Sequence, residues 1–97
     1  MGPSLVGVGV GPGDPELLTV RALRTLREAD RVFGPTMAED SVGRAESIVR
    51  GAAPEVAVER LVFAILRDDA ARAAAHRAAA ERVVACLEAG ERVAFST

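Results

Sequence analysis

The sequence contains no lysine, tryptophan or tyrosine, and its only cysteine is Cys86. With three phenylalanines as its only aromatic residues, the chain has little with which to stack nucleic-acid bases. A single cysteine cannot form a disulfide within the chain, which is typical of a reducing compartment, so we expect a cytoplasmic protein. No apolar run approaches the roughly 20 residues of a membrane span, and the N-terminus has no basic flank followed by a signal core. We therefore predict no membrane partner.

The chain also has no large excess of positive or negative charge. The 12 basic residues, all arginines, stand against 14 acidic residues, which gives a net charge of −2. Such a balance provides no basic surface for nucleic acid, and we predict no nucleic-acid partner. The 97 residues are enough for one small domain.

The most informative stretch is the opening one, which reads LVGVGVGPGDPELLT from Leu5 to Thr19. Valines among glycines predict a buried first strand. Gly11-Pro12-Gly13 ends this strand, because proline removes a backbone donor and glycine allows positive φ. Asp14 is a good N-cap for a helix that we expect from Pro15 to about Ala29. The turn then lies at the carboxyl end of a strand, where open α/β sheets bind ligands.

Two familiar nucleotide-binding motifs do not fit this turn. Counted from Gly7 or Gly9, the sixth place of the dinucleotide fingerprint is Pro12 or Asp14 instead of glycine. A P-loop requires a lysine, which the chain lacks. An acidic Asp14 at the start of a helix would also repel a phosphate. The turn therefore suits a ligand that is neutral or cationic near this point.

The middle of the chain predicts shorter elements. Arg31-Val32-Phe33 is expected to form a second strand that Gly34-Pro35 ends. Ser41 caps a short predicted helix to about Arg50, with Gly51 just after its last turn. A third strand is expected within residues 56–66, where apolar residues become nearly continuous.

The last third predicts a long helix and a strand. Asp68 or Asp69 caps an alanine-rich helix that ends near Ala89, with Gly90 as its C′ residue. Residues 91–97 form the fourth predicted strand. The alternation of strands and helices predicts an α/β fold with a mostly parallel sheet and covering helices.

The string GVGPGDPELLTVRA, followed by LREAD and an apolar strand, resembles the opening of the tetrapyrrole (corrin/porphyrin) methylases. These enzymes use S-adenosylmethionine to methylate precorrins and uroporphyrinogen. The later order is most similar to the branch that methylates carbon 20 of precorrin-2 in cobalamin biosynthesis: LVF, an aspartate pair, an alanine-rich helix, then GERVAFST. Uroporphyrinogen methylases carry a Tyr-Asp-Arg-Leu-like segment after the second strand. Residues 33–36 read FGPT here, which argues against that branch.

The resemblance also implies an arrangement of domains. It covers essentially all 97 residues, which correspond to less than half of a family member. We therefore expect residues 1–97 to be the N-terminal domain of a two-domain methylase fold, truncated after the fourth strand. In the family a downstream Gly-Asp-Pro turn completes the donor site, and we expect this chain alone to be inactive.

The same resemblance implies roles for the opening turn. Gly11, Pro12 and Gly13 are expected to bind S-adenosylmethionine, and Gly9 and Asp14 to line the trough that holds the tetrapyrrole. The Asp14 carboxylate suits the pyrrole N–H donors. The plainer alternatives are that the glycines only form a tight turn and that Asp14 only caps a helix. The implied partners are the tetrapyrrole and, in the full-length protein, a second copy in a homodimer.

Other side chains are weaker candidates. Arginine binds carboxylates bidentately, so five arginines are candidates to grip the substrate's acids: Arg31, Arg44, Arg50, Arg60 and Arg67. Thr19 and His76 are expected on helix surfaces, and Cys86 as a small buried apolar residue. No residue set predicts a metal site or a covalent nucleophile.

Two other functions stay open. The chain could be another methylase of this fold that acts on a different corrin carbon, on uroporphyrinogen III, on ribosomal RNA or on a protein histidine. It could instead be a non-catalytic α/β module that self-associates through an exposed final strand, because an unpaired strand edge invites pairing.

Overall fold

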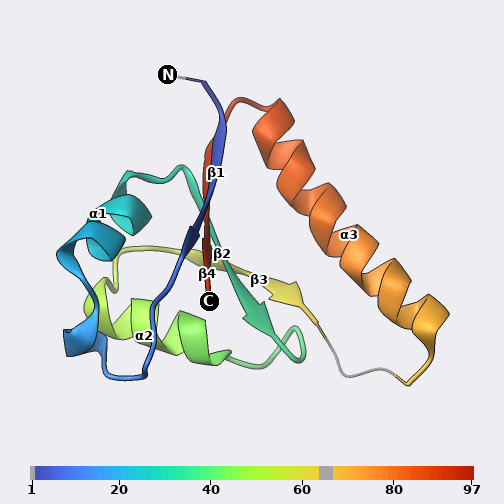
Figure 1. Cartoon of the computed structure of the whole chain (residues 1–97), viewed down its shortest axis with the longest axis horizontal. Helices are drawn as coiled ribbons and strands as arrows, with labels where there is room; N and C mark the ends of the chain where they lie inside the picture. The colour runs from blue at the N-terminus through green and yellow to red at the C-terminus, as the bar shows by residue number, and fades with distance from the viewer. Residues whose placement is uncertain (1, 64–66) are drawn as a thin grey trace.

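A computed structural model describes residues 2–63 and 67–97 (Figure 1). Its elements in chain order are β1 (Ser4–Val8), η1 (Pro15–Leu17), α1 (Val20–Glu28), β2 (Arg31–Thr36), α2 (Arg44–Ala52), β3 (Val58–Val62), α3 (Asp69–Glu88) and β4 (Arg92–Ser96). The four strands form one sheet in the order β1-β4-β2-β3, and every pair is parallel. The predicted α/β fold with a parallel sheet is confirmed. No helix of the described residues has the length and apolar character that crossing a membrane requires.

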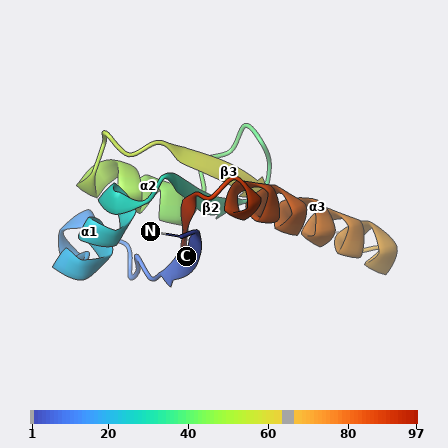
Figure 2. The ribbon, with the colours of Figure 1, turned by 90° about the horizontal axis from the view of Figure 1, so that it is seen from above.

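Two apolar cores lie on opposite faces of the sheet, because neighbouring strand residues point to opposite sides. Val32 and Ala94 join the core formed with α1 and α2. Their chain neighbours Phe33 and Val93 join the core formed with α3. In the view of Figure 2, α1 and α2 lie on the left and α3 extends away to the right.

The prediction of one continuous helix from Pro15 to Ala29 is wrong, because the chain forms two separate helical elements there, the short η1 and then α1. Asp14 caps only the short η1, with its Oδ1 2.9 Å from the Glu16 nitrogen. The backbone is extended at Leu18 and Thr19, and the Thr19 hydroxyl then caps α1 by accepting from the Ala22 nitrogen at 3.0 Å. Thr19 is therefore an N-cap, not a mid-helix surface residue.

The Gly34-Pro35 pair does not end the second strand, since β2 continues to Thr36. The ladder between β2 and β4 stops at Phe33, so Pro35 is paired only with β3. A proline is tolerated there because β2 has become an edge on that side. Gly34 is needed for space: a Cβ would lie 3.1 Å from Val58 Cγ1 and 3.2 Å from Ser96 Oγ.

The predicted position of α2 is shifted. The helix begins after Gly43, not at Ser41, and it continues through Gly51 to Ala52. Ser41 instead lies in the preceding loop, where its carbonyl accepts from the Thr36 hydroxyl at 2.6 Å. Gly51 is needed inside the helix because a Cβ there would lie 2.5 Å from the Pro15 ring.

The predicted strand positions are corrected at both ends of the chain. Strand β1 is an edge strand whose Ser4–Gly7 segment is exposed, so the expectation of a buried first strand is wrong. Strand β4 lies between β1 and β2, so it is not an exposed final strand. The third strand is β3, and the part of its predicted range at 64–66 lies outside the described residues.

The long helix is confirmed. Asp68 caps α3 by accepting from the Ala71 nitrogen at 3.0 Å, and Gly90 follows it with a φ of 81°. Only the later turns of α3 contribute to the core, through Ala79 and Cys86 with Val83 and Leu87 beside them. Cys86 is buried as expected.

Candidate ligand site

The carboxyl ends of the four parallel strands meet at one edge of the sheet. The turn of residues 9–14 follows β1, Thr97 follows β4, and the loop of residues 37–43 follows β2. The ladder continues into the turn, because Thr97 N donates to the Val8 carbonyl and Val10 N donates to the Thr97 carbonyl, both at 3.0 Å. Figure 1 shows the C-terminus at this edge, beside β1. Three connections far apart in the sequence are thus brought together.

The 9–14 turn is anchored at its base and open at its tip. Val10 is 1% exposed and packs into the core with α1 and α2. The residues that follow, 11–14, are exposed, and the peptide bond between Gly11 and Pro12 is cis. The turn therefore presents backbone to its surroundings from a fixed position.

The glycines of this turn differ from Gly34, Gly43 and Gly51, which are tightly packed. A Cβ at Gly9, Gly11 or Gly13 would meet nothing within 4 Å. At Gly43, by contrast, a Cβ would lie 2.1 Å from the Pro35 carbonyl oxygen. Gly13 has a φ of 157°, which side chains rarely adopt, but the described chain gives no such reason for Gly9 or Gly11. Open glycines suit the close approach of another group to the backbone.

Two adjoining hollows lie along the carboxyl edge. The first has a volume of about 280 Å³ and is lined by Val10, Gly11, Pro12, Pro35, Arg44, Ala45, Ile48 and Thr97. The second, of about 370 Å³, is lined by Pro35, Thr36, Met37, Ser41, Val42, Gly43, Arg44 and Phe63. They share Pro35 and Arg44, so together they run from the 9–14 turn to the 37–43 loop.

The predicted site residues divide into two groups. Gly11 and Pro12 line the first hollow, whereas Gly9, Gly13 and Asp14 lie on the exposed turn beside it. Asp14 has the capping role that was its plainer alternative, at η1 and not at a long helix. Pro35 and Thr97 also line the hollows, although no local pattern predicts them as site residues. The wrong end assigned to the second strand hid Pro35, and only the strand order places Thr97 beside Val10.

The candidate arginines are also separated by the structure. Arg60 and Arg50 both pair with Glu46, at 2.7 and 3.2 Å. Within the described residues Arg44 has no ion pair or side-chain hydrogen bond, and it lines both hollows. Arg44 thus lines both hollows with its guanidinium uncommitted, whereas Arg67 is exposed in the segment after β3 and lines neither hollow.

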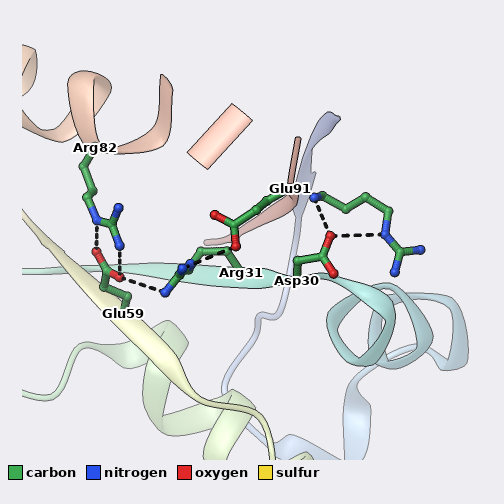
Figure 3. Close-up of polar contacts among 6 residues, drawn as sticks. Asp30, Arg31, Glu59, Arg82 and Glu91 are labelled. Carbon is green, nitrogen blue, oxygen red and sulfur yellow. Dashed lines mark hydrogen bonds and ion pairs between the residues drawn. The ribbon is translucent and has the colours of Figure 1, made fainter. Parts of the chain in front are cut away.

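Arg31 lies at the opposite, amino edge of the sheet. Figure 3 shows its guanidinium between Glu59 and Glu91, at 3.7 and 3.3 Å, in a network that links β2, β3 and the turn before β4. Arg82 of α3 binds the same Glu59 bidentately and, with burial opposing it, holds the pKa of that carboxyl below its usual value. This network connects structural elements at the edge remote from the hollows.

A separate contact lies at the same edge, just before β2 begins. The backbone nitrogen of Arg92 donates to Asp30 at 2.8 Å, and this bond lowers the pKa of the Asp30 carboxyl (Figure 3). Among residues 2–63 and 67–97, no group of three or more His, Cys, Asp or Glu side chains is placed to hold a metal ion. His76 is exposed, as expected, and its ring lies 5.6 Å from that of Phe63.

The chain is an α/β domain with an open glycine turn and two hollows at the carboxyl edge of its parallel sheet, the edge at which such sheets bind ligands. The sequence profile of the Tetrapyrrole (Corrin/Porphyrin) Methylases matches residues 4–97. The chain belongs to this family.

Individual relatives refine the comparison. A precorrin-2 C(20)-methyltransferase of Sinorhizobium sp is 39% identical over 99 residues, which cover 93% of this chain and 40% of that protein. A cobalt-precorrin-2 C(20)-methyltransferase of Salmonella typhimurium is 35% identical over 98 residues, covering 100% of this chain and 41% of that protein. A uroporphyrinogen-III C-methyltransferase of Paracoccus denitrificans is 57% identical, but over only 35 residues. The chain thus spans about 40% of the length of these two C(20)-methyltransferases.

Proposed function

We propose that the protein transfers a methyl group from S-adenosylmethionine to carbon 20 of precorrin-2 or cobalt-precorrin-2 in cobalamin biosynthesis. Relatives named for methylation at this carbon match nearly the whole chain, whereas the uroporphyrinogen relative matches 36% of it. The observation that best supports a binding site for this reaction is the open glycine turn, which lies beside two hollows at the carboxyl edge of the sheet.

The residues of the turn fit the methyl donor. Gly11 and Gly13 offer backbone free of side chains on either side of Pro12, and Gly11 and Pro12 line the hollow next to Thr97. Asp14 and Glu16 make this end of the site acidic, which suits a ligand with a sulfonium and an ammonium group. When bound, S-adenosylmethionine supplies an electrophilic methyl group.

The second hollow fits the acceptor. Met37, Val42 and Phe63 give it apolar walls suited to a tetrapyrrole ring, and Arg44 can bind one of the ring's carboxylates. We also propose that Gly9 and Asp14 contact the acceptor from the turn. Methyl transfer to a nucleophilic carbon needs no covalent enzyme intermediate. The chain's contribution is therefore to position the two ligands and exclude water.

A chimera tests this proposal. The matching segment of the Sinorhizobium methyltransferase is replaced by residues 1–97, and methyl transfer to precorrin-2 is measured. We expect the chimera to be active and Gly11→Val to lower its kcat/KM about a hundredfold, because misplacing reacting groups by about 1 Å costs this much.

Gly2→Val is the matched control, since a Cβ at Gly2 also meets nothing within 4 Å but the residue lies before β1, outside the hollows. This variant should keep the activity of the chimera. Equal losses in both variants would contradict a role for the turn. A chimera that binds S-adenosylhomocysteine but does not methylate precorrin-2 would contradict the assigned acceptor.

We further propose that the protein forms a homodimer through β1. This strand has a free edge and exposes Leu5 and Val6, 56% and 41%. A lysine on an edge strand opposes pairing, so Val6→Lys should shift the protein toward monomer in light-scattering chromatography. Val20→Lys, at an exposed position at the start of α1, should leave the dimer intact. A monomeric unsubstituted protein would refute this proposal.

A further inference from the structure

An ion pair between Glu46 and Arg60 lies beside the 37–43 loop, and the proposed methyl transfer does not use it directly. Glu46 of α2 has a side chain only 3% exposed, and Arg60 of β3 binds it through two bonds. Arg60 Nε donates to Oε1 at 2.7 Å and Nη2 donates to Oε2 at 3.1 Å. The guanidinium is thereby fixed in one orientation, as bidentate pairs require.

The remaining nitrogen of this guanidinium reaches the loop. Arg60 Nη1 donates to the Glu39 carbonyl at 2.8 Å. From the other side, the Thr36 hydroxyl lies 3.1 Å from the Ala38 carbonyl and 2.6 Å from the Ser41 carbonyl. The backbone of the 37–43 loop is therefore held from both of its flanks, and this loop forms a wall of the second hollow.

Stability alone does not account for the arrangement. A buried ion pair is often no more stabilising than apolar residues of the same volume. The neighbouring residue Glu59 makes an equivalent bidentate pair with Arg82 on the opposite face of the sheet. Arg82 has no hydrogen bond to a loop carbonyl among the described residues, whereas Arg60 does. The two pairs are both bidentate arginine–glutamate pairs, and they differ in that Arg60 also binds a carbonyl of the 37–43 loop.

We propose that Arg60 is a positioning residue that, oriented by Glu46, holds the 37–43 loop as the acceptor wall. The identity of the acceptor rests on the proposed function, but the loop contact does not. Arg60 reaches the ligand only through the loop, so its loss should weaken acceptor binding and leave donor binding at the 9–14 turn unchanged.

The first test follows the loop itself by amide hydrogen exchange in the 97-residue chain. The Ser41 amide donates to the Ala38 carbonyl at 3.0 Å and reports loop opening. Arg60→Lys keeps a cation beside Glu46. A single ammonium lacks the forked guanidinium of arginine, so it cannot bind Glu46 and the Glu39 carbonyl at once. We expect the Ser41 amide to exchange about tenfold faster in this variant. In Arg82→Lys, the matched control, its rate should not change.

The second test uses the chimera described above and measures its dissociation constants for precorrin-2 and S-adenosylhomocysteine. Arg60→Lys should raise the constant for precorrin-2 about tenfold and leave that for S-adenosylhomocysteine unchanged. Arg82→Lys should change neither. Equal Ser41 exchange rates in the two variants would overturn the positioning role, whichever ligand binds. Faster exchange without any precorrin-2 binding would instead refute the proposed function alone.

Discussion

Replacing Glu46 with alanine is expected to lower the free energy of unfolding by about 1–3 kcal/mol, because it leaves two partly buried donor nitrogens of Arg60 without their acceptor. Arg60 is 25% exposed and relies on this carboxylate for two of its three side-chain hydrogen bonds. Arg50 loses the same partner at 3.2 Å, although its own side chain is largely in solvent. Urea denaturation at pH 7 measures the loss.

The pH dependence of unfolding identifies the charge as the cause. The hydrogen bonds from Arg60, opposed by burial, hold the pKa of the Glu46 carboxyl below its ordinary value. A carboxyl with a lowered folded-state pKa stabilises the protein fully above its unfolded-state pKa. That contribution is lost as the pH falls through the folded-state pKa. Glu46→Gln should therefore destabilise the protein at pH 7 and make the acid limb of its stability curve shallower.

Glu88→Gln is the control for this comparison, since Glu88 is exposed on the last turn of α3. It should change the free energy of unfolding by no more than about 0.5 kcal/mol, as surface substitutions usually do. An acid limb that Glu46→Gln leaves as steep as in the unsubstituted protein would show that other carboxyls control acid unfolding.

Local signals in the sequence were sufficient for the elements whose ends depend on their own residues. Asp68 and Gly90 mark α3 because an N-cap side chain and a C′ glycine act within a few residues of the helix. The first strand ends at Val8, before the Gly11-Pro12-Gly13 turn that was predicted to end it. Alternation of strands and helices then predicts the parallel sheet.

Competing local signals were harder to decide. Pro15 and Thr19 can each begin a helix, and only packing selects between one helix and two pieces. The Pro15 ring packs against Gly51 of α2, and no periodicity in residues 15–29 encodes this contact between η1 and α2. Thr19 then has the free hydroxyl that caps the second piece.

Non-local pairing explains what the sequence does not predict about the site. The insertion of β4 between β1 and β2 brings Thr97 beside Val10 and leaves β1 as an edge. The same register releases Pro35 from a ladder on one side, so β2 extends into the region read as a breaker. The Glu46–Arg60 pair joins residues on different elements, and neither residue has a local pattern that marks it as buried.

Replacing Phe33 with alanine is the other change with a large expected effect, a loss of about 3–5 kcal/mol in the free energy of unfolding. Phe33 is 0% exposed at the centre of β2, where it packs with Leu61 and Val93 of the flanking strands. It also packs against α3, in one apolar core with Ala79 and Cys86. The Arg82 guanidinium carbon lies 5.9 Å from the centre of its ring and adds a cation–π contact.

The loss should be concentrated on α3, because this helix contacts the core through its later turns only. A domain of this size has a total stability of about 5–15 kcal/mol, so Phe33→Ala removes a large share of it. Amide exchange should accelerate most along α3 and less along α2, whose core lies on the opposite face. Val84→Ala, at a 47% exposed position on α3, is the control and should cost little. Uniform acceleration in both helices would show that the two faces unfold as one unit, and the carboxyl-edge hollows would then depend on both cores.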